Sequence, residues 1–179
     1  MKEIPLFKVH MPESVREPLN KVLFSGFIGQ GPKVEEFEKV LSKYFDNPNT
    51  LSLNSGTSAI HLALRLANIG PGDEVITTPM TCTATNMPIM ATGAKMVWAD
   101  IDPVTGLICP DSIRSKITKK TKAIIMVHFG GIPCQIDEIN EIAKSNNILT
   151  IEDAAHSFGS VSYTHLTLPT IRLVVLGGG

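Results

Sequence analysis

The sequence predicts an α/β fold built on a mostly parallel, doubly wound sheet. Short apolar runs typical of buried strands alternate with segments of helical length along most of the 179 residues. Such alternation indicates parallel strands joined by crossover helices. The composition, with 43% hydrophobic and 18% charged residues, is that of a globular protein.

The expected elements follow from the positions of apolar residues and of turn-forming residues. The expected strands cover residues 51–54, 74–78, 95–99, 122–128 and 148–151. The expected helices cover residues 12–24, 32–45, 56–64, 81–92, 110–117 and 136–145. Pro18 should interrupt or bend the first helix, because an interior proline removes a backbone donor. The glycine-rich segment 25–32 should be a loop, but it contains neither of the two common phosphate-loop motifs.

Charge and cysteine content exclude several classes of protein. The net charge is −1, and lysine and arginine form no long block, so no nucleic-acid partner is expected. The three cysteines, Cys82, Cys109 and Cys134, form no C-x-x-C pair, which argues against a disulfide framework and a zinc site. No signal peptide or run of transmembrane length is visible, so we expect a cytoplasmic protein without a membrane partner.

The last stretch, residues 161–179, differs from the rest of the chain. It loses the alternating pattern, carries no acidic residue and ends in three glycines. It could be an ordinary edge strand, but we favour a non-native tail that does not belong to the fold. The expected organisation is an N-terminal helix and loop over 1–30, an α/β domain over 31–160, and this tail.

The strand that ends at Glu152 and Asp153 marks the first candidate site. Open α/β sheets bind their ligands at the carboxyl ends of strands. Asp153 and His156 are three residues apart at a turn, so both side chains could face one small molecule. An aspartate stabilises a protonated ring nitrogen, as an electron-sink cofactor such as pyridoxal phosphate requires. The alternative is that Asp153 only forms a turn and His156 is structural.

A second candidate site lies at the start of the helix expected near Gly56. The free backbone amides of Gly56, Thr57 and Ser58, with two hydroxyl groups, could bind a phosphate. The alternative is a plain helix cap formed by Ser55. Asp100 and Asp102 resemble a metal pair, but a turn before Gly106 is the favoured interpretation, and no metal site is expected.

Four stretches in chain order resemble the DegT/StrS-type family of pyridoxal-phosphate sugar aminotransferases. They are G-F-I-G-Q-G-P-K-V-E-E-F-E from Gly26, N-S-G-T-S-A-I-H-L-A-L from Asn54, T-T-P-M-T-C-T-A-T-N from Thr77, and V-H-F-G-G-I-P-C-Q-I-D-E-I from Val127 with I-E-D-A-A-H-S-F-G from Ile151. The resemblance covers about residues 5–160. It implies the large domain of the type I aminotransferase fold, with 31–160 as part of the cofactor-binding domain and the chain truncated before the smaller C-terminal domain.

The resemblance also implies roles for individual residues. Asp153 would pair with the pyridine nitrogen, and His156, where the family has Gln or His, would contact the phenolic oxygen. Gly56, Thr57 and Ser58 would hold the phosphate of pyridoxal 5'-phosphate.

Other positions depart from the family pattern or lie further from the cofactor. Cys82 stands where the family usually stacks an aromatic residue on the cofactor ring, and a cysteine offers less contact area. His128 would support the site from the end of its strand. The residues expected near the substrate are Phe27, Gly29, Thr85 and Asn86.

The family's Schiff-base lysine follows the E-D-A-A-H stretch, whereas the last lysine of this sequence is Lys144, which precedes it. The chain is therefore expected to be an N-terminal part that cannot turn over. The parent enzyme would transfer an amino group, expected from glutamate, to a keto group of a nucleotide-linked sugar, as a homodimer. The alternatives are a related sugar dehydratase with histidine in place of the lysine, and a non-catalytic sensor that binds cofactor or sugar.

Overall fold

The computed structural model describes residues 9–158 and 174–175. The chain divides into two compact units, unit 1 (Met1–Ser52) and unit 2 (Leu53–Gly179). Of the tail that the sequence sets apart, only Val174–Val175 lies within the described residues, as the two-residue strand β5. The expected boundaries at residues 30 and 160, and the non-native origin of the tail, stay predictions.

Unit 1 contains a short 3-10 helix, η1 (Glu13–Val15), and two α-helices, α1 (Arg16–Leu23) and α2 (Pro32–Tyr44). The expected interruption at Pro18 is wrong, because Pro18 lies in the first turn of α1, where its missing amide has no helical partner to lose. The start of α2 at Pro32 is confirmed. Neither helix contains a buried residue.

The strand expected over 51–54 is wrong. Leu51 and Leu53 are exposed, so no second layer covers this apolar stretch. The backbone amide of Ser52 donates to the Glu38 carboxylate at 2.7 Å instead of to a neighbouring strand, and the Ser52 hydroxyl donates to the same oxygen. These two bonds lower the pKa of Glu38.

Unit 2 is the α/β part of the chain, and its boundaries match the expected ranges closely. Its strands are β1 (Glu74–Thr77), β2 (Lys95–Trp98), β3 (Thr121–Val127), β4 (Leu149–Asp153) and β5. Its helices are α3 (Gly56–Leu66), α4 (Thr83–Thr92), α5 (Pro110–Lys116), the 3-10 helix η2 (Phe129–Gly131) and α6 (Ile136–Ser145). None of the described helices is long and apolar enough to cross a membrane.

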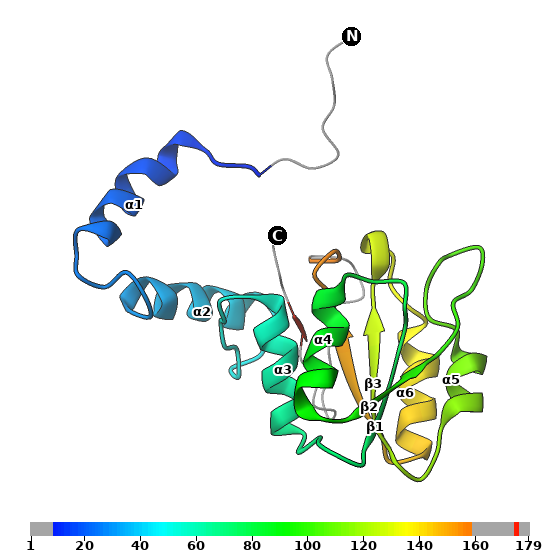
Figure 1. Cartoon of the computed structure of the whole chain (residues 1–179). Helices are drawn as coiled ribbons and strands as arrows, with labels where there is room; N and C mark the ends of the chain where they lie inside the picture. The colour runs from blue at the N-terminus through cyan, green and yellow to red at the C-terminus, as the bar shows by residue number, and fades with distance from the viewer. Residues whose placement is uncertain (1–8, 159–173, 176–179) are drawn as a thin grey trace. The chain divides into compact units, whose positions relative to one another are not determined.

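The strands form one sheet in the order β2-β1-β3-β4-β5, and every neighbouring pair is parallel. Helices α3 and α4 lie on one face of this sheet, and α5 and α6 lie on the other (Figure 1). The predicted doubly wound α/β fold is confirmed.

Two apolar layers fill the space between the sheet and its helices. The layer under α3 and α4 includes Ala123, Ile125 and Ile151, and the layer under α5 and α6 includes Ile124 and Met126. Successive residues of β3 thus face opposite layers, as the two-residue period of a strand requires.

The parallel topology fixes where the helices begin. Each helix returns the chain to the start of the next strand, so α3, which leads into β1, and α4, which leads from β1 into β2, both begin at the carboxyl edge of the sheet. The amino ends of these two helices therefore lie at the same edge as the last residue of β4, Asp153.

Candidate functional site

Asp153 is the central residue of the candidate site. Because Ile151 faces the layer under α3 and α4, Asp153 two positions later faces the same side. The Asp153 side chain is largely buried, with 7% of the residue exposed. Its Oδ2 atom accepts a hydrogen bond from the Thr85 hydroxyl at 2.7 Å, and its Oδ1 atom accepts one from the Ala155 backbone amide at 3.2 Å.

Thr85 is more than a neighbour of the site, because it holds the carboxylate in place. As its hydroxyl donates to Asp153, the Thr85 oxygen accepts from the Thr81 hydroxyl at 2.8 Å. The sequence prediction placed Thr85 near the substrate and missed this partnership. The signal that could have found it is topological, since α4 begins at the edge where β4 ends.

The side chain of Asn86, the next residue on α4, makes hydrogen bonds within the fold. Its Nδ2 group donates to the Thr78 carbonyl oxygen at 3.1 Å, and its Oδ1 atom accepts from the Thr77 hydroxyl at 2.8 Å. Asn86 is buried, so it joins α4 to the end of β1. The structure brings Thr85 to Asp153 but gives the Asn86 amide two partners within unit 2.

Cys82 is the N-terminal capping residue of α4 and is exposed. It therefore lies at the carboxyl edge of the sheet, where α4 begins. No side-chain hydrogen bond caps this end of α4. The thiol is accessible to a ligand at this edge.

The start of α3 has the geometry of a capped helix. The Ser55 hydroxyl oxygen accepts from the Ser58 backbone amide at 3.1 Å and donates to the Ser58 hydroxyl at 2.9 Å. The predicted Ser55 cap is confirmed. The first helical hydrogen bond runs from the Ala59 amide to the Ser55 carbonyl, so the Gly56 and Thr57 amides have no partner within the helix and point out of its amino end. The helix dipole makes this end positive.

His156 lies on the turn that follows β4 and is exposed. This turn is closed by a 2.9 Å hydrogen bond from the Ser157 amide to the Ala154 carbonyl. The His156 Nδ1 atom accepts from the Gly130 backbone amide at 3.3 Å, and its ring lies 5.8 Å from that of Phe129. His156 is thus positioned by the loop after β3, whereas Asp153 is positioned by α4.

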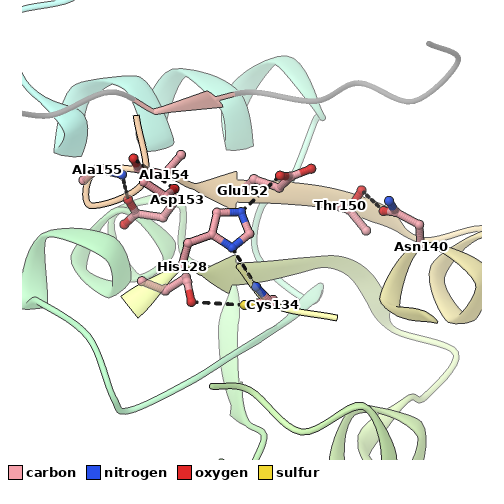
Figure 2. A network of polar contacts seen from close by, with 10 residues as sticks. His128, Cys134, Asn140, Thr150, Glu152, Asp153, Ala154 and Ala155 are labelled. Carbon is pink, nitrogen blue, oxygen red and sulfur yellow. Dashed lines mark hydrogen bonds and ion pairs between the residues drawn. The ribbon is translucent and has the colours of Figure 1, made fainter. Parts of the chain in front are cut away.

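A second polar cluster lies on the opposite face of the sheet. Figure 2 shows the fully buried His128 ring between Glu152 and Cys134. His128 Nε2 lies 3.1 Å from Glu152 Oε2, and His128 Nδ1 accepts from the Cys134 amide at 3.1 Å. Burial raises the pKa of the Cys134 thiol to about 12, with the Glu152 charge as the second cause. The sequence predicted that His128 supports the site from the end of its strand, but it did not identify Glu152 or Cys134 as its partners.

The remaining predictions concern two residues of unit 1 and the aspartates near Gly106. Phe27 and Gly29 belong to unit 1, where they line an apolar hollow. The turn interpretation of Asp102 is confirmed, because its Oδ1 atom accepts from the Val104 amide and from the amide and hydroxyl of Thr105. The described residues contain no group of three or more histidine, cysteine, aspartate or glutamate residues that could hold a metal ion.

Comparison with known proteins identifies the family of this chain. The DegT/DnrJ/EryC1/StrS aminotransferase family profile matches residues 10–165. The chain is 42% identical over 145 residues to the spore coat polysaccharide biosynthesis protein SpsC of Bacillus subtilis, which covers 81% of this chain and 37% of SpsC.

Solved structures give the same result. The sugar aminotransferase CalS13 from Micromonospora echinospora superposes with a TM-score of 0.83 at 37% identity, covering 88% of this chain and 44% of CalS13. A putative sugar aminotransferase from Streptococcus pneumoniae, Spr1654 in its PLP form, gives a TM-score of 0.81 at 37% identity over 87% of this chain and 44% of its own. The chain thus spans less than half the length of these relatives. It belongs to the DegT/DnrJ/EryC1/StrS aminotransferase family.

Proposed function

We propose that the carboxyl edge of the sheet, on the face covered by α3 and α4, binds pyridoxal 5'-phosphate. The observation that carries this proposal is the position of Asp153, a carboxylate held by Thr85 at the same edge and face as the start of α3. The PLP form of the related Spr1654 structure supports the choice of cofactor.

The chemistry of the residues at this edge fits that cofactor. The cofactor's phosphate is an anion, and the start of α3 offers the Gly56 and Thr57 amides and the Thr57 and Ser58 hydroxyls. The pyridine nitrogen needs an anionic partner to stay protonated, and Asp153 is a carboxylate. The phenolic oxygen needs a hydrogen-bond donor, which an imidazole such as His156 can supply.

Each residue would then have a distinct task. Asp153 would hold the proton on the ring nitrogen, and Thr85 would keep the carboxylate in one orientation. Cys82 would pack against the ring, and His156 would donate to the phenolic oxygen. When bound, the cofactor would carry the amino group from donor to acceptor by alternating between its aldehyde and amine forms.

We further propose that an enzyme containing this domain transfers an amino group, from glutamate, to a keto group of a nucleotide-linked sugar. The sugar aminotransferases among the relatives support the sugar as acceptor. Such an enzyme also needs the family's lysine, which no position after Lys144 of this sequence supplies. A homodimer, a substrate-proximal position for Phe27 and Gly29, and a cytoplasmic location stay predictions.

Cofactor binding by the chain is the first test. Titration with pyridoxal phosphate and with pyridoxamine phosphate should give saturable absorbance changes. Asp153→Asn keeps the shape of the side chain but removes its charge, so it should weaken binding at least tenfold, or about 1.4 kcal/mol. Asp137→Asn, at an exposed position of α6, is the matched control and should bind as the unmodified chain does. Equal affinity in Asp153→Asn would refute the proposed site.

Turnover needs a second experiment on the gene itself. The genomic DNA downstream of codon 160 is sequenced, and any longer protein it encodes is incubated with glutamate and a nucleotide-linked keto sugar. Formation of 2-oxoglutarate together with an amino sugar would establish amino transfer. Loss of water from the sugar without amino transfer would favour the dehydratase. Cofactor or sugar binding with no product would favour a sensor.

A further inference from the structure

We propose that His156 is held as the Nε2–H tautomer by the loop that follows β3, so that its other ring nitrogen, Nε2, is a fixed hydrogen-bond donor. The loop is residues 128–134, named the His128–Cys134 loop below. The purpose of this donor, a hydrogen bond to the phenolic oxygen of the cofactor, rests on the proposed function. The tautomer itself is argued only from contacts within the protein.

The first step is the hydrogen bond at Nδ1 of His156. The Gly130 backbone amide can only donate, so the His156 Nδ1 atom, 3.3 Å away, must accept. A ring nitrogen that accepts carries no proton, and a neutral imidazole has one N–H group in total. That proton is therefore on Nε2, because the partner of one ring nitrogen sets the state of the other.

The second step is the fit between the loop and the turn that carries His156. Gly130 and Gly131 have φ angles of +64° and +84°, which favour glycine. A Cβ atom at Gly131 would lie 3.0 Å from the His156 carbonyl oxygen, which is tighter than most such contacts, so a larger residue would push this carbonyl away. The Phe129 ring lies beside the imidazole, with ring centroids 5.8 Å apart. The loop and the turn thus contact each other at three successive loop residues.

The third step is the anchoring of the loop at both ends. Its first residue, His128, accepts the amide hydrogen of its last residue, Cys134, at 3.1 Å. His128 therefore carries its own proton on Nε2 and donates it to Glu152, 3.1 Å away (Figure 2). The Cys134 thiol also donates to the Val127 carbonyl. Since His128 and Glu152 are fully buried, the loop is fixed to the ends of β3 and β4.

These steps make His128 and Glu152 positioning residues for His156. Their side chains lie on the face of the sheet opposite the Asp153 side chain, and the loop joins them to His156. The two faces would then have separate tasks. The α3 and α4 face holds the ring nitrogen and the phosphate, and the opposite face orients the donor for the phenolic oxygen.

The tautomer can be measured directly without any cofactor. The chain is labelled with ¹⁵N-histidine and studied by NMR at about pH 8.5, where an ordinary imidazole is neutral. Of the five histidines, His156 is assigned by the signals that His156→Gln removes. We expect the proton on Nε2 in His156. A proton on Nδ1, or an even mixture of both tautomers, would overturn the proposal.

The role of the loop is tested by two alanine substitutions at glycines with similar backbone angles. Gly131→Ala puts a Cβ atom against the His156 carbonyl and should shift His156 toward a mixture of tautomers. Gly106→Ala carries a comparable φ of +72° but has nothing within 4 Å, so it controls for backbone strain and should leave the His156 signals unchanged. If Gly131→Ala leaves the His156 signals unchanged, the loop does not hold the tautomer, and that part of the proposal is wrong.

Cofactor titration separates this proposal from the proposed function. His156→Gln keeps an N–H donor and should retain affinity within about twofold, whereas His156→Phe should lose roughly tenfold, as expected for one hydrogen bond to a charged acceptor. If the unmodified chain binds no cofactor, the proposed function fails while the tautomer stands. If the cofactor binds but His156→Phe binds equally well, the donor role fails while the proposed function stands.

Discussion

The Thr85 hydroxyl and the Asp153 carboxylate are 68 residues apart in the chain and meet at 2.7 Å at the carboxyl edge of the sheet. Thr85 is 1% exposed and Asp153 7%. A hydrogen bond to a charged group contributes about 1.5–3 kcal/mol to stability, and a buried carboxylate that loses its donor costs a similar amount. This bond therefore fixes the start of α4 to the end of β4 and orients the carboxylate.

Thr85→Val should lower the free energy of unfolding by about 1.5–3 kcal/mol, because valine keeps the volume of threonine and removes the donor. Thr85→Ser, which keeps the hydroxyl, should lose less than Thr85→Val. Urea unfolding followed by circular dichroism measures both. Thr83→Val, at an exposed position two residues earlier on α4, is the control and should change stability by less than about 0.5 kcal/mol. Equal stability of Thr85→Val and the unmodified chain would show that the bond contributes nothing.

The buried contact between His128 and Glu152 should also contribute to the stability of the fold. Glu152→Leu removes the acceptor of the His128 N–H group at a fully buried position, which should lower the free energy of unfolding by about 1–3 kcal/mol. Glu152→Gln keeps an oxygen that can accept from His128 and should cost less. The difference between the two variants in urea unfolding measures the hydrogen bond apart from the packing. A Glu152→Leu variant as stable as Glu152→Gln would mean that the pair is not needed for the fold.

The sequence predicted most of the fold because alternation and apolar periodicity are local properties. The helix over 136–145 and the strand ending at Asp153 are examples, since each is decided by residues within its own span. The strand expected over 51–54 failed because its two leucines find no covering layer and Glu38, fourteen residues earlier, takes the Ser52 amide. A local pattern cannot reveal that distant competitor.

The candidate site likewise contains residues that local sequence signals predict and contacts that they do not. Asp153 and the Ser55 cap could be predicted because strand ends and helix starts have local signals. The Thr85 contact to Asp153 and the His128 contact to Glu152 could not, since each depends on which strands become neighbours in the sheet. Alternation predicts a parallel sheet but does not give its order.

Glu74 should make the folded chain sensitive to acid. A hydrogen bond from Thr118 and one from Lys95 lower the pKa of the Glu74 carboxyl below its ordinary value. A group whose pKa is lower in the folded state contributes stability above its unfolded pKa, about 4.3 for glutamate, and this contribution is lost as the pH falls through the folded pKa. Glu74→Gln should therefore be less stable than the unmodified chain at pH 7, and the difference should shrink below about pH 4.

Thermal melts of the two proteins across this pH range measure that difference. Glu141→Gln, at an exposed position of α6, is the matched control and should follow the unmodified chain at every pH. A stability difference for Glu74→Gln that stays constant as the pH falls would contradict the assignment.

Unit 1 should be the first part of the chain that a protease cuts. Neither α1 nor α2 contains a buried residue, so opening these helices exposes little additional apolar surface. Brief trypsin digestion should cut after Arg16, Lys21 or Lys33 before any site in β1 to β4, and mass spectrometry identifies the products. Protection of residues 9–52 would indicate instead that another molecule, such as a second copy of the chain, covers these helices.

The three cysteines should differ sharply in their reaction with iodoacetamide, and this difference tests the position of the cofactor. The thiolate is the reactive form, and burial raises the pKa of Cys134 to about 12, so Cys134 should stay unmodified at pH 8 until urea unfolds the chain. Exposed Cys82 should react in the native state. If Cys82 packs against the cofactor ring, saturating pyridoxal phosphate should slow its alkylation at least fivefold while the rate at the half-buried Cys109 stays constant. Equal slowing at both residues would indicate a general effect of the reagent, and no slowing at Cys82 would place the ring away from the start of α4.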